Sequence, residues 1–226
     1  MIIIRLTARG SRYRLREIFT DLWSCCVEGV KWIFGFLDGA VYLAKKKMEK
    51  KNKVFIATSI DGFIADAAGA IDWLHDIPNP DNDDMGYLEF ISGIDAIMMG
   101  RSTFEAVVGF DIEWPFEKPV FVLSNSLSEV PKKVKTKNVQ IVNGALTDVL
   151  KLAHDQGFYV IYVDGGKTIQ GFLHEDLIDE MTITIIPVIL GGGTKLFSGG
   201  TRLDFACTQT KMFLDKIVQN KFSRVR

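Results

Sequence analysis

Short apolar runs recur along the chain from residue 53 onward, and segments of mixed polarity separate them. Runs rich in β-branched and aromatic residues predict strands at 53–60, 94–99, 120–123, 139–142 and 159–163. The segments that alternate with them predict helices at 84–92, 103–108, 146–156 and 168–174. Strands that are apolar on both faces and alternate with helices are typical of a parallel-rich sheet covered on both sides.

The pattern changes after residue 180, where apolar runs follow one another with little room for helices. We predict strands at 181–186, 204–214 and 216–225, and we expect them to join the same sheet as antiparallel additions. The predicted fold class is therefore α/β, with a mostly parallel central sheet and antiparallel C-terminal strands. Residues 48–226 contain no internal repeat or linker, so we interpret them as one domain.

Residues 1–47 form an N-terminal extension that is basic and partly amphipathic. They contain nine Lys and Arg against four Asp and Glu, whereas the remainder contains 18 against 24. Charges interrupt the apolar stretch at 15–43, which argues against a membrane span and a secretory signal. Two interpretations stay open: an extension that the main domain can dispense with, and an interfacial helix at a membrane surface. Met48 comes just before the first predicted strand, so we expect function to reside in residues 48–226.

Composition and charge exclude several classes of protein. A hydrophobic content of 47% with 24% charged residues is ordinary for a globular protein with a real core. The net-acidic main body gives no reason to expect nucleic acid as a partner, since phosphate backbones require a clustered basic face. The cysteines, Cys25, Cys26 and Cys207, do not resemble a disulfide framework, so a reducing cytoplasm is expected. The three histidines lack metal-ligand spacing, and no metal site is predicted.

Two glycine-containing turns carry the chemistry that the sequence predicts most clearly. In the first, Gly100 and Arg101 end a buried strand, and Thr103 lies in the first turn of the next helix. In the second, residues 164–169 again join a strand to a helix through a glycine pair. Glycine permits close backbone approach and free N–H groups at a helix start attract anions, so both turns suit phosphate. Because ligands collect at the carboxyl ends of parallel strands, the pair suits a molecule with separated phosphates. Neither turn has the G-x-G-x-x-G pattern, which disfavours a classical Rossmann dehydrogenase.

Several motifs occur in an order and spacing that resemble a known superfamily. They are 57–65 (ATSIDGFIA), Trp73, 94–105 (IDAIMMGRSTFE), 122–124 (VLS), 164–166 (DGG) and 187–193 (PVILGGG). Together they resemble the dihydrofolate reductase superfamily over nearly all of residues 53–226. The likeness is greatest to small stand-alone proteins related to the reductase domain of the riboflavin-biosynthesis deaminase-reductase. The resemblance implies a dihydrofolate-reductase-like three-layer fold.

The resemblance also implies NADPH as cofactor and hydride transfer to a pterin-like or pyrimidine-like small molecule. Ala57 and Ile64 would contact the nicotinamide carboxamide, and Ser124 would lie near the adenosine ribose and its 2′-phosphate. The phosphate contacts would come from Gly100, Arg101, Thr103, Gly165, Gly166, Lys167, Thr168 and Ile169. In dihydrofolate reductases a cis peptide joins the corresponding glycines, so one is expected between Gly165 and Gly166.

Two acidic residues are candidates for catalysis, and each has a structural alternative. Asp84 falls where bacterial dihydrofolate reductases keep the acid that binds the pterin, but the acidic segment 81–84 is also an ordinary helix start. Asp61 matches the Ser-x-Asp-Gly of the riboflavin branch, where this turn borders the cleft, but Asp-Gly also closes simple turns.

The substrate side is defined mainly by aromatic residues and by missing charges. Trp73 and Tyr87 could stack on a flat ring, although such residues are more often core. An inserted loop follows Trp73, which argues against true dihydrofolate reduction. No Lys or Arg occurs between Asp66 and Ile94, so a phosphorylated ribityl pyrimidine is not expected either.

A competing hypothesis is a non-enzymatic nucleotide-binding protein that has retained the turns and lost the substrate acid. The riboflavin branch is commonly dimeric, so the resemblance also implies a homodimer.

Overall fold

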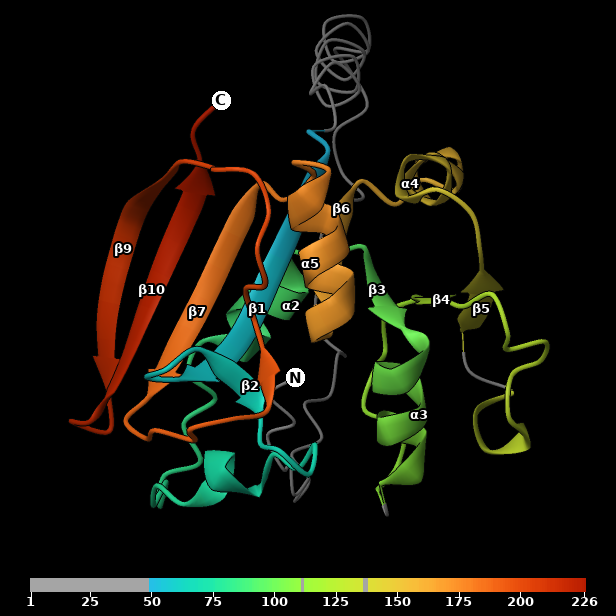
Figure 1. Cartoon of the computed structure of the whole chain (residues 1–226). Coiled ribbons are helices and arrows are strands. Elements are labelled where there is room, and N and C mark those ends of the chain that lie inside the picture. Colours follow the sequence, from blue (N-terminus) through green and yellow to red (C-terminus); the bar gives the residue numbers. More distant parts are fainter. Residues whose placement is uncertain (1–48, 111, 136–137) are drawn as a thin grey trace, which may run out of the picture. The chain divides into compact units, whose positions relative to one another are not determined.

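A single large sheet forms the centre of the part of the chain that the structure describes, residues 49–110, 112–135 and 138–226 of a computed structural model (Figure 1). Its strand order is β5-β4-β3-β6-β1-β7-β10-β9. The strands are β1 (Lys51–Ser59), β3 (Ala96–Gly100), β4 (Val120–Leu123), β5 (Val139–Val142), β6 (Val160–Asp164), β7 (Glu180–Ile186), β9 (Phe205–Phe213) and β10 (Ile217–Arg224). The predicted α/β class is confirmed, and every strand expected from the apolar runs is present.

The sheet is parallel from β5 through β7 and antiparallel only at β10 and β9. Our expectation that the segment near 181–186 would be an antiparallel addition is therefore wrong. Helix α5 (Gly166–His174) provides the crossover that returns the chain before β7, which pairs in parallel with β1. The turn at 214–216 then joins β9 to β10 as an antiparallel hairpin.

Helices cover the two faces of the sheet and make the fold three-layered. Helices α4 (Leu146–Asp155) and α5 pack on one face, and α2 (Tyr87–Ser92) and α3 (Arg101–Gly109) pack on the other. In Figure 1, α5 lies in front of the sheet and α2 behind it. Neighbours along β1 alternate between the layers, since Val54 and Ile56 belong to the first core and Phe55 to the second.

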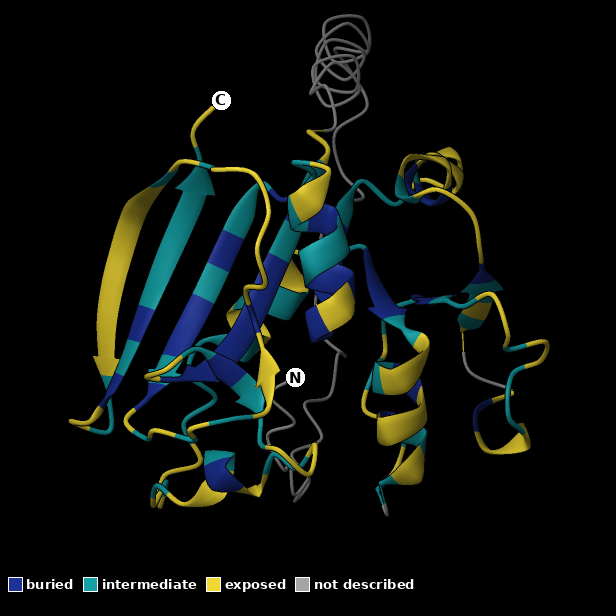
Figure 2. Cartoon of the chain, viewed as in Figure 1, coloured by how far each residue is buried: buried dark blue, intermediate teal, exposed yellow. Residues whose placement is uncertain are grey.

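Burial falls toward one edge of the sheet. The middle strands are buried, whereas β9 is exposed along most of its length (Figure 2). A third apolar cluster, which includes Ala57, Trp73, Ile186 and Ile217, packs near the end of β1.

Some short elements were not predicted. They are the small sheet of β2 (Phe63–Ala65) with β8 (Thr194–Lys195) and the 3-10 helices η1 (Asp72–His75) and η2 (Lys132–Val134). The extension predicted at residues 1–47 lies outside the described residues.

Candidate functional site

The two predicted glycine turns lie side by side at the carboxyl edge of the sheet. Strands β3 and β6 are parallel neighbours, and Met99 pairs with Asp164, so both turns leave the sheet at the same level. A Cβ atom on Gly165 would collide with the Thr103 hydroxyl, and one on Gly100 would lie 2.9 Å from the Thr168 hydroxyl. Each turn therefore needs glycine partly because a threonine of the other turn packs against it.

A hollow of about 630 Å³ opens over these turns. This volume is in the range of small-molecule sites in proteins. Of the residues predicted to contact the cofactor, the hollow is lined by Ile64, Gly100, Arg101, Thr103, Gly165, Gly166, Lys167 and Thr168. Residues that sequence reasoning did not assign also line it, among them Ile71, Leu123, Leu146 and Thr194.

The start of α5 presents polar groups to this hollow. The first N–H groups of a helix have no partner within the helix, and Lys167 adds an exposed ammonium group beside them. Ile169 does not line the hollow: its side chain is fully buried, and its N–H donates to the Gly165 carbonyl at 2.9 Å. Ile169 thus anchors the turn from within the core.

Arg101 joins the first turn to the loop that follows β4. Its Nη1 donates to the Ser126 hydroxyl at 2.8 Å, and its Nε lies 3.6 Å from Glu105 Oε1. The Ser124 hydroxyl accepts the N–H groups of Ser126 and Leu127 and so fixes the start of this loop. The Arg101 guanidinium group therefore lies at the loop that begins with Ser124, although this loop has no positive residue next to Ser124 in the sequence. Ala57 does not line the hollow and is buried in the third cluster.

The second turn is built without a cis peptide, and the described residues contain none. Our expectation of a cis bond between Gly165 and Gly166 is therefore wrong. The backbone turns at Gly165 instead, with φ 89° and ψ 137°, a conformation that glycine adopts readily and other residues rarely do.

Asp61 joins the turn after β1 to the loop at residues 190–191 through hydrogen bonds. Its carboxylate accepts the Ser59 hydroxyl at 2.6 Å and the N–H groups of Leu190 and Gly191 at 3.1 and 2.8 Å. The hydrogen bond from Ser59 is the main cause that lowers the pKa of Asp61, and the two N–H groups add to it. Asp61 is therefore ionised near neutral pH and ties the glycine-rich segment to the turn after β1.

Asp84 and Trp73 occupy structural positions. The two carboxylate oxygens of Asp84 accept the N–H groups of Gly86 and Leu88 at 2.9 and 2.8 Å, which is a cap on the start of α2. Asp84 does not line the hollow, so the geometry favours the helix-start interpretation that the sequence left open. Trp73 is 7% exposed and packs in the third cluster.

Asp164 is a buried acid to which the sequence assigned no role of its own, and it precedes the glycine pair. It is 1% exposed, and its Oδ1 accepts the Gly165 N–H at 2.8 Å. Burial raises the pKa of Tyr87 to about 12, and the charge of Asp164 adds to that rise. Burial, and then the same charge, also raise the pKa of Tyr162. The tyrosine hydroxyls are therefore protonated, and Tyr87 is linked electrostatically to the turn that carries Gly165.

Residues 53–219 match the model of the RibD C-terminal domain. The chain belongs to this family. Its likeness to the uncharacterized protein YwjB of Bacillus subtilis is 36% identity over 152 residues, which cover 66% of this chain and 84% of that protein. The crystal structure of the "Putative riboflavin biosynthesis protein" from Shewanella sp. PV-4 shares 47% identity at a TM-score of 0.76, covering 78% of this chain and 99% of that one.

The fold extends to dihydrofolate reductase. The Enterococcus faecalis enzyme, solved with NADP(H), is 14% identical at a TM-score of 0.54, covering 78% of this chain and 97% of that one, and it shows the fold alone. The resemblance stated from the motifs is thus confirmed, and the chain is reductase-like in family and fold.

Two further facts concern the described residues only. None of their helices is long and apolar enough to cross a membrane. Their His, Cys, Asp and Glu residues form no group of three that could hold a metal ion.

Proposed function

We propose that this RibD C-terminal domain protein is an NADPH-dependent reductase that transfers a hydride to a small heterocycle, pterin-like or pyrimidine-like. The observation that supports the proposal is the hollow over the two glycine turns, at the carboxyl ends of β3 and β6. Ligands of open parallel sheets bind at this edge. Family membership and fold support the reductase class.

The residues present fit a dinucleotide. A Cβ atom on Gly165 or Gly166 would collide with Thr103 or Ile64, so packing holds both positions to glycine, and glycine leaves the backbone open to close approach by a ligand. The start of α5 and Lys167 would hold the pyrophosphate, because helix N–H groups and an ammonium group both favour an anion. Thr103 and Gly100 would complete the cradle from the first turn.

Arg101 supports the choice of the phosphorylated cofactor. Its guanidinium group lies at the loop that begins with Ser124, where the adenosine ribose is expected. A 2′-phosphate there would gain a charge-assisted bond to Arg101, whereas an unphosphorylated ribose would gain none. Discrimination between NADPH and NADH should therefore depend on this side chain.

The bound cofactor would supply a hydride, and the chain's own residues would orient the substrate and exclude water. Ile64 borders the hollow close to Gly166 and would contact the nicotinamide. Tyr87 does not line the hollow, but from the start of α2 it would meet a substrate that extends beyond the hollow, and its protonated hydroxyl suits hydrogen-bond donation to a ring oxygen or nitrogen. Asp61 is ionised and fully engaged, so it would order the loops and would not supply the proton.

Oxidation of NADPH against a panel of dihydrofolate, pyrimidine and quinonoid compounds tests the proposal. We expect turnover with at least one of them, and we expect Tyr87→Phe to raise the KM for that substrate by about tenfold through loss of one hydrogen bond. The affinity for NADPH should stay unchanged in this variant, because the ring still packs on Phe55 at a centroid distance of 5.7 Å.

A non-enzymatic nucleotide-binding protein is the competing hypothesis, and the use of Asp84 as a helix cap favours it. NADPH binding without turnover of any compound in the panel would support that hypothesis. Absence of NADPH binding would contradict both.

A further inference from the structure

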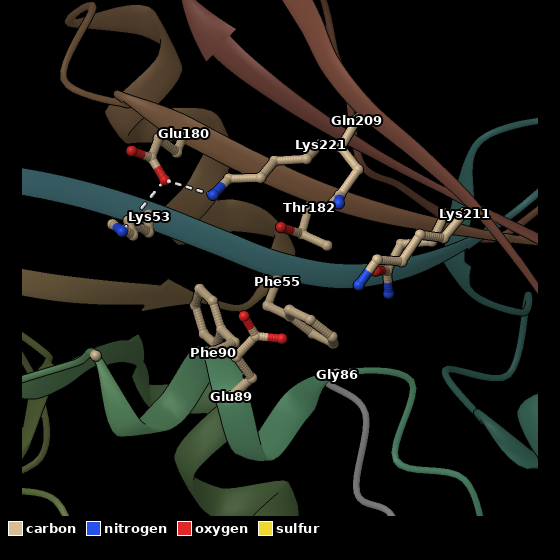
Figure 3. A pocket seen from close by; sticks show the side chains of 12 residues that line it. Lys53, Phe55, Gly86, Glu89, Phe90, Glu180, Thr182, Gln209, Lys211 and Lys221 are labelled. Carbon is tan, nitrogen blue, oxygen red and sulfur yellow. Dashed lines mark ion pairs between the residues drawn. The ribbon is translucent and has the colours of Figure 1, made fainter.

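A second hollow lies on the α2 side of the sheet (Figure 3). It is separate from the hollow over the two glycine turns, which we name the coenzyme hollow after its proposed ligand. Its volume is about 240 Å³, which is enough for a small molecule. It lies near the starts of β1 and β7, whereas the coenzyme hollow is at the carboxyl ends of the parallel strands. The two hollows share no lining residue. This one is lined by Lys53, Phe55, Gly86, Glu89, Phe90, Gly93, Glu180, Thr182, Gln209, Lys211, Gln219 and Lys221.

Lysines from two strands converge on Glu180 at the rim of this hollow. The carboxylate lies 3.0 Å from Lys51 Nζ, 3.2 Å from Lys53 Nζ and 3.4 Å from Lys221 Nζ. Figure 3 shows Lys53 and Lys221 reaching Glu180 from opposite sides. One carboxylate neutralises one ammonium group, so Lys53 and Lys221, which both line the hollow, share a single counter-charge from Glu180.

Lys211 and Glu89 face the remainder of the hollow from β9 and from α2. Among the described residues, Lys211 forms no ion pair within 4.0 Å. The lining contains three lysines, Lys53, Lys211 and Lys221, against Glu89 and Glu180, an excess of one positive charge. The polar side chains of Thr182 and Gln209 lie between Lys221 and Lys211 in Figure 3.

Repulsion between these lysines lowers the stability of the folded protein unless a counter-charge is bound. The lysines come from three strands and project from one face of the sheet into the same recess, where their mutual repulsion opposes the folded state. Phe55 and Phe90 form the apolar wall of the recess and offer no counter-charge to the lysines. A bound anion would remove the repulsion and would meet several donors at once.

We propose that this hollow binds a small, multiply charged oxyanion, either a phosphate compound or a polycarboxylate. Lys53, Lys211 and Lys221 would act as point-charge partners, since an ammonium group donates in several directions and suits both kinds of anion. Thr182 and Gln209 would add neutral donors. Glu89 opposes the anion from α2, so the site's affinity is set by the balance between this carboxylate and Lys211.

Calorimetric titration of the full chain with inorganic phosphate and, separately, with citrate tests the proposal. Ionic strength is held constant with sodium chloride, so that general screening does not change. We expect saturable binding of at least one anion. Tighter binding of phosphate indicates a phosphate compound as the natural ligand, and tighter binding of citrate indicates a polycarboxylate. Lys211→Gln should weaken this binding by about three- to tenfold, the lower range for a charged partner at a partly exposed site. Glu89→Gln should tighten it by a similar factor, because it removes the opposing charge.

Lys216→Gln is the matched control, because it removes one exposed lysine in the turn between β9 and β10, outside both hollows. It should leave the anion affinity unchanged. Equal weakening in Lys211→Gln and Lys216→Gln would overturn the proposal, as would an affinity that neither Lys211→Gln nor Glu89→Gln changes. Anion bound in the coenzyme hollow would not respond to Lys211 or Glu89, so the result does not depend on the proposed reductase function.

Discussion

At the scale of single residues, the glycines of the coenzyme hollow serve packing as well as ligand approach. The sequence predicts bare backbone at Gly100, Gly165 and Gly166 because phosphates must come close. The structure adds that Thr103 and Thr168 fill the space beside Gly165 and Gly100, and that Ile64 fills the space beside Gly166. A bulky residue such as valine at 166 would therefore disturb folding as well as binding. Arg101 is the better residue for testing the cofactor, because its side chain is half exposed and packs against no core.

Residue-level roles were the least predictable part of the site. Asp84 and Trp73 match family positions by type and spacing, yet the first caps a helix and the second fills a core cluster. Side-chain direction depends on the backbone path through residues 66–86, which has no regular period in the sequence. Asp164 was part of a quoted motif but received no role, because one acid at the end of a strand carries no pattern of its own.

Glu180 should make stability depend on pH below about 4.5. Burial acts to raise its pKa, but hydrogen bonds and charges from Lys51, Lys53 and Lys221 outweigh burial and lower the pKa to about 2. Stability from this carboxylate is therefore full above its ordinary pKa of 4.5 and is lost as pH falls toward 2. Glu180→Gln should lower the free energy of unfolding by about 1–3 kcal/mol at pH 7. Denaturant titrations at pH 7 and pH 3 should show that this difference shrinks in acid. A difference that stays constant would mean that the lysines contribute nothing to the lowered pKa.

At the scale of elements, periodicity predicted the long strands and helices but not the short ones. Strand β2 has three residues and β8 has two, which is too few to show alternation. They pair because the chain at Gly193 comes so close to the Ala65 carbonyl that no Cβ atom would fit. The direction of β7 relative to β1 could not be predicted from the sequence either, since the spacing of apolar residues does not distinguish parallel from antiparallel pairing at this strand.

Asp84 tests whether α2 carries a catalytic acid or only a cap. Asp84→Ala should lower the free energy of unfolding by about 1 kcal/mol, the usual loss for a helix cap. Asp84→Asn should melt close to the wild-type temperature, because asparagine also caps helices. Thermal melts and turnover of any identified substrate are measured together. Turnover that falls at least tenfold in Asp84→Asn, with an unchanged melt, would restore Asp84 as the acid.

At the scale of the whole molecule, the site follows from topology. The parallel order β4-β3-β6-β1 brings the ends of β3 and β6 together from positions more than 60 residues apart in sequence. The sequence predicted this edge as the ligand site because strand-to-helix turns in one parallel sheet share the carboxyl edge, where ligands collect. The basic hollow on the α2 face could not be foreseen in this way, since its lysines come from strands whose order only the folded sheet reveals.

Residues 1–47 should be dispensable for the folding of the reductase-like domain. Among the described residues, the members of the three core clusters lie between 54 and 222, so a chain that begins at Met48 retains all of these. We expect this shortened chain to unfold in one cooperative thermal transition at the temperature of the full chain, and to bind NADPH equally well. Loss of the cooperative transition would show that residues 1–47 complete the core.

The central claim is that the hollow over Gly100 and Gly165 holds NADPH, and paired affinity measurements test it most directly. Titrations of the wild type with NADPH and with NADH, followed by cofactor fluorescence, should show tighter binding of NADPH. Arg101→Ala should weaken NADPH binding by about 1.5–3 kcal/mol, the contribution of a charged hydrogen bond, and should leave NADH binding nearly unchanged. The thermal melt should stay close to the wild type, because Arg101 is half exposed. Equal affinities for NADPH in the wild type and a correctly folded Arg101→Ala variant would contradict the account.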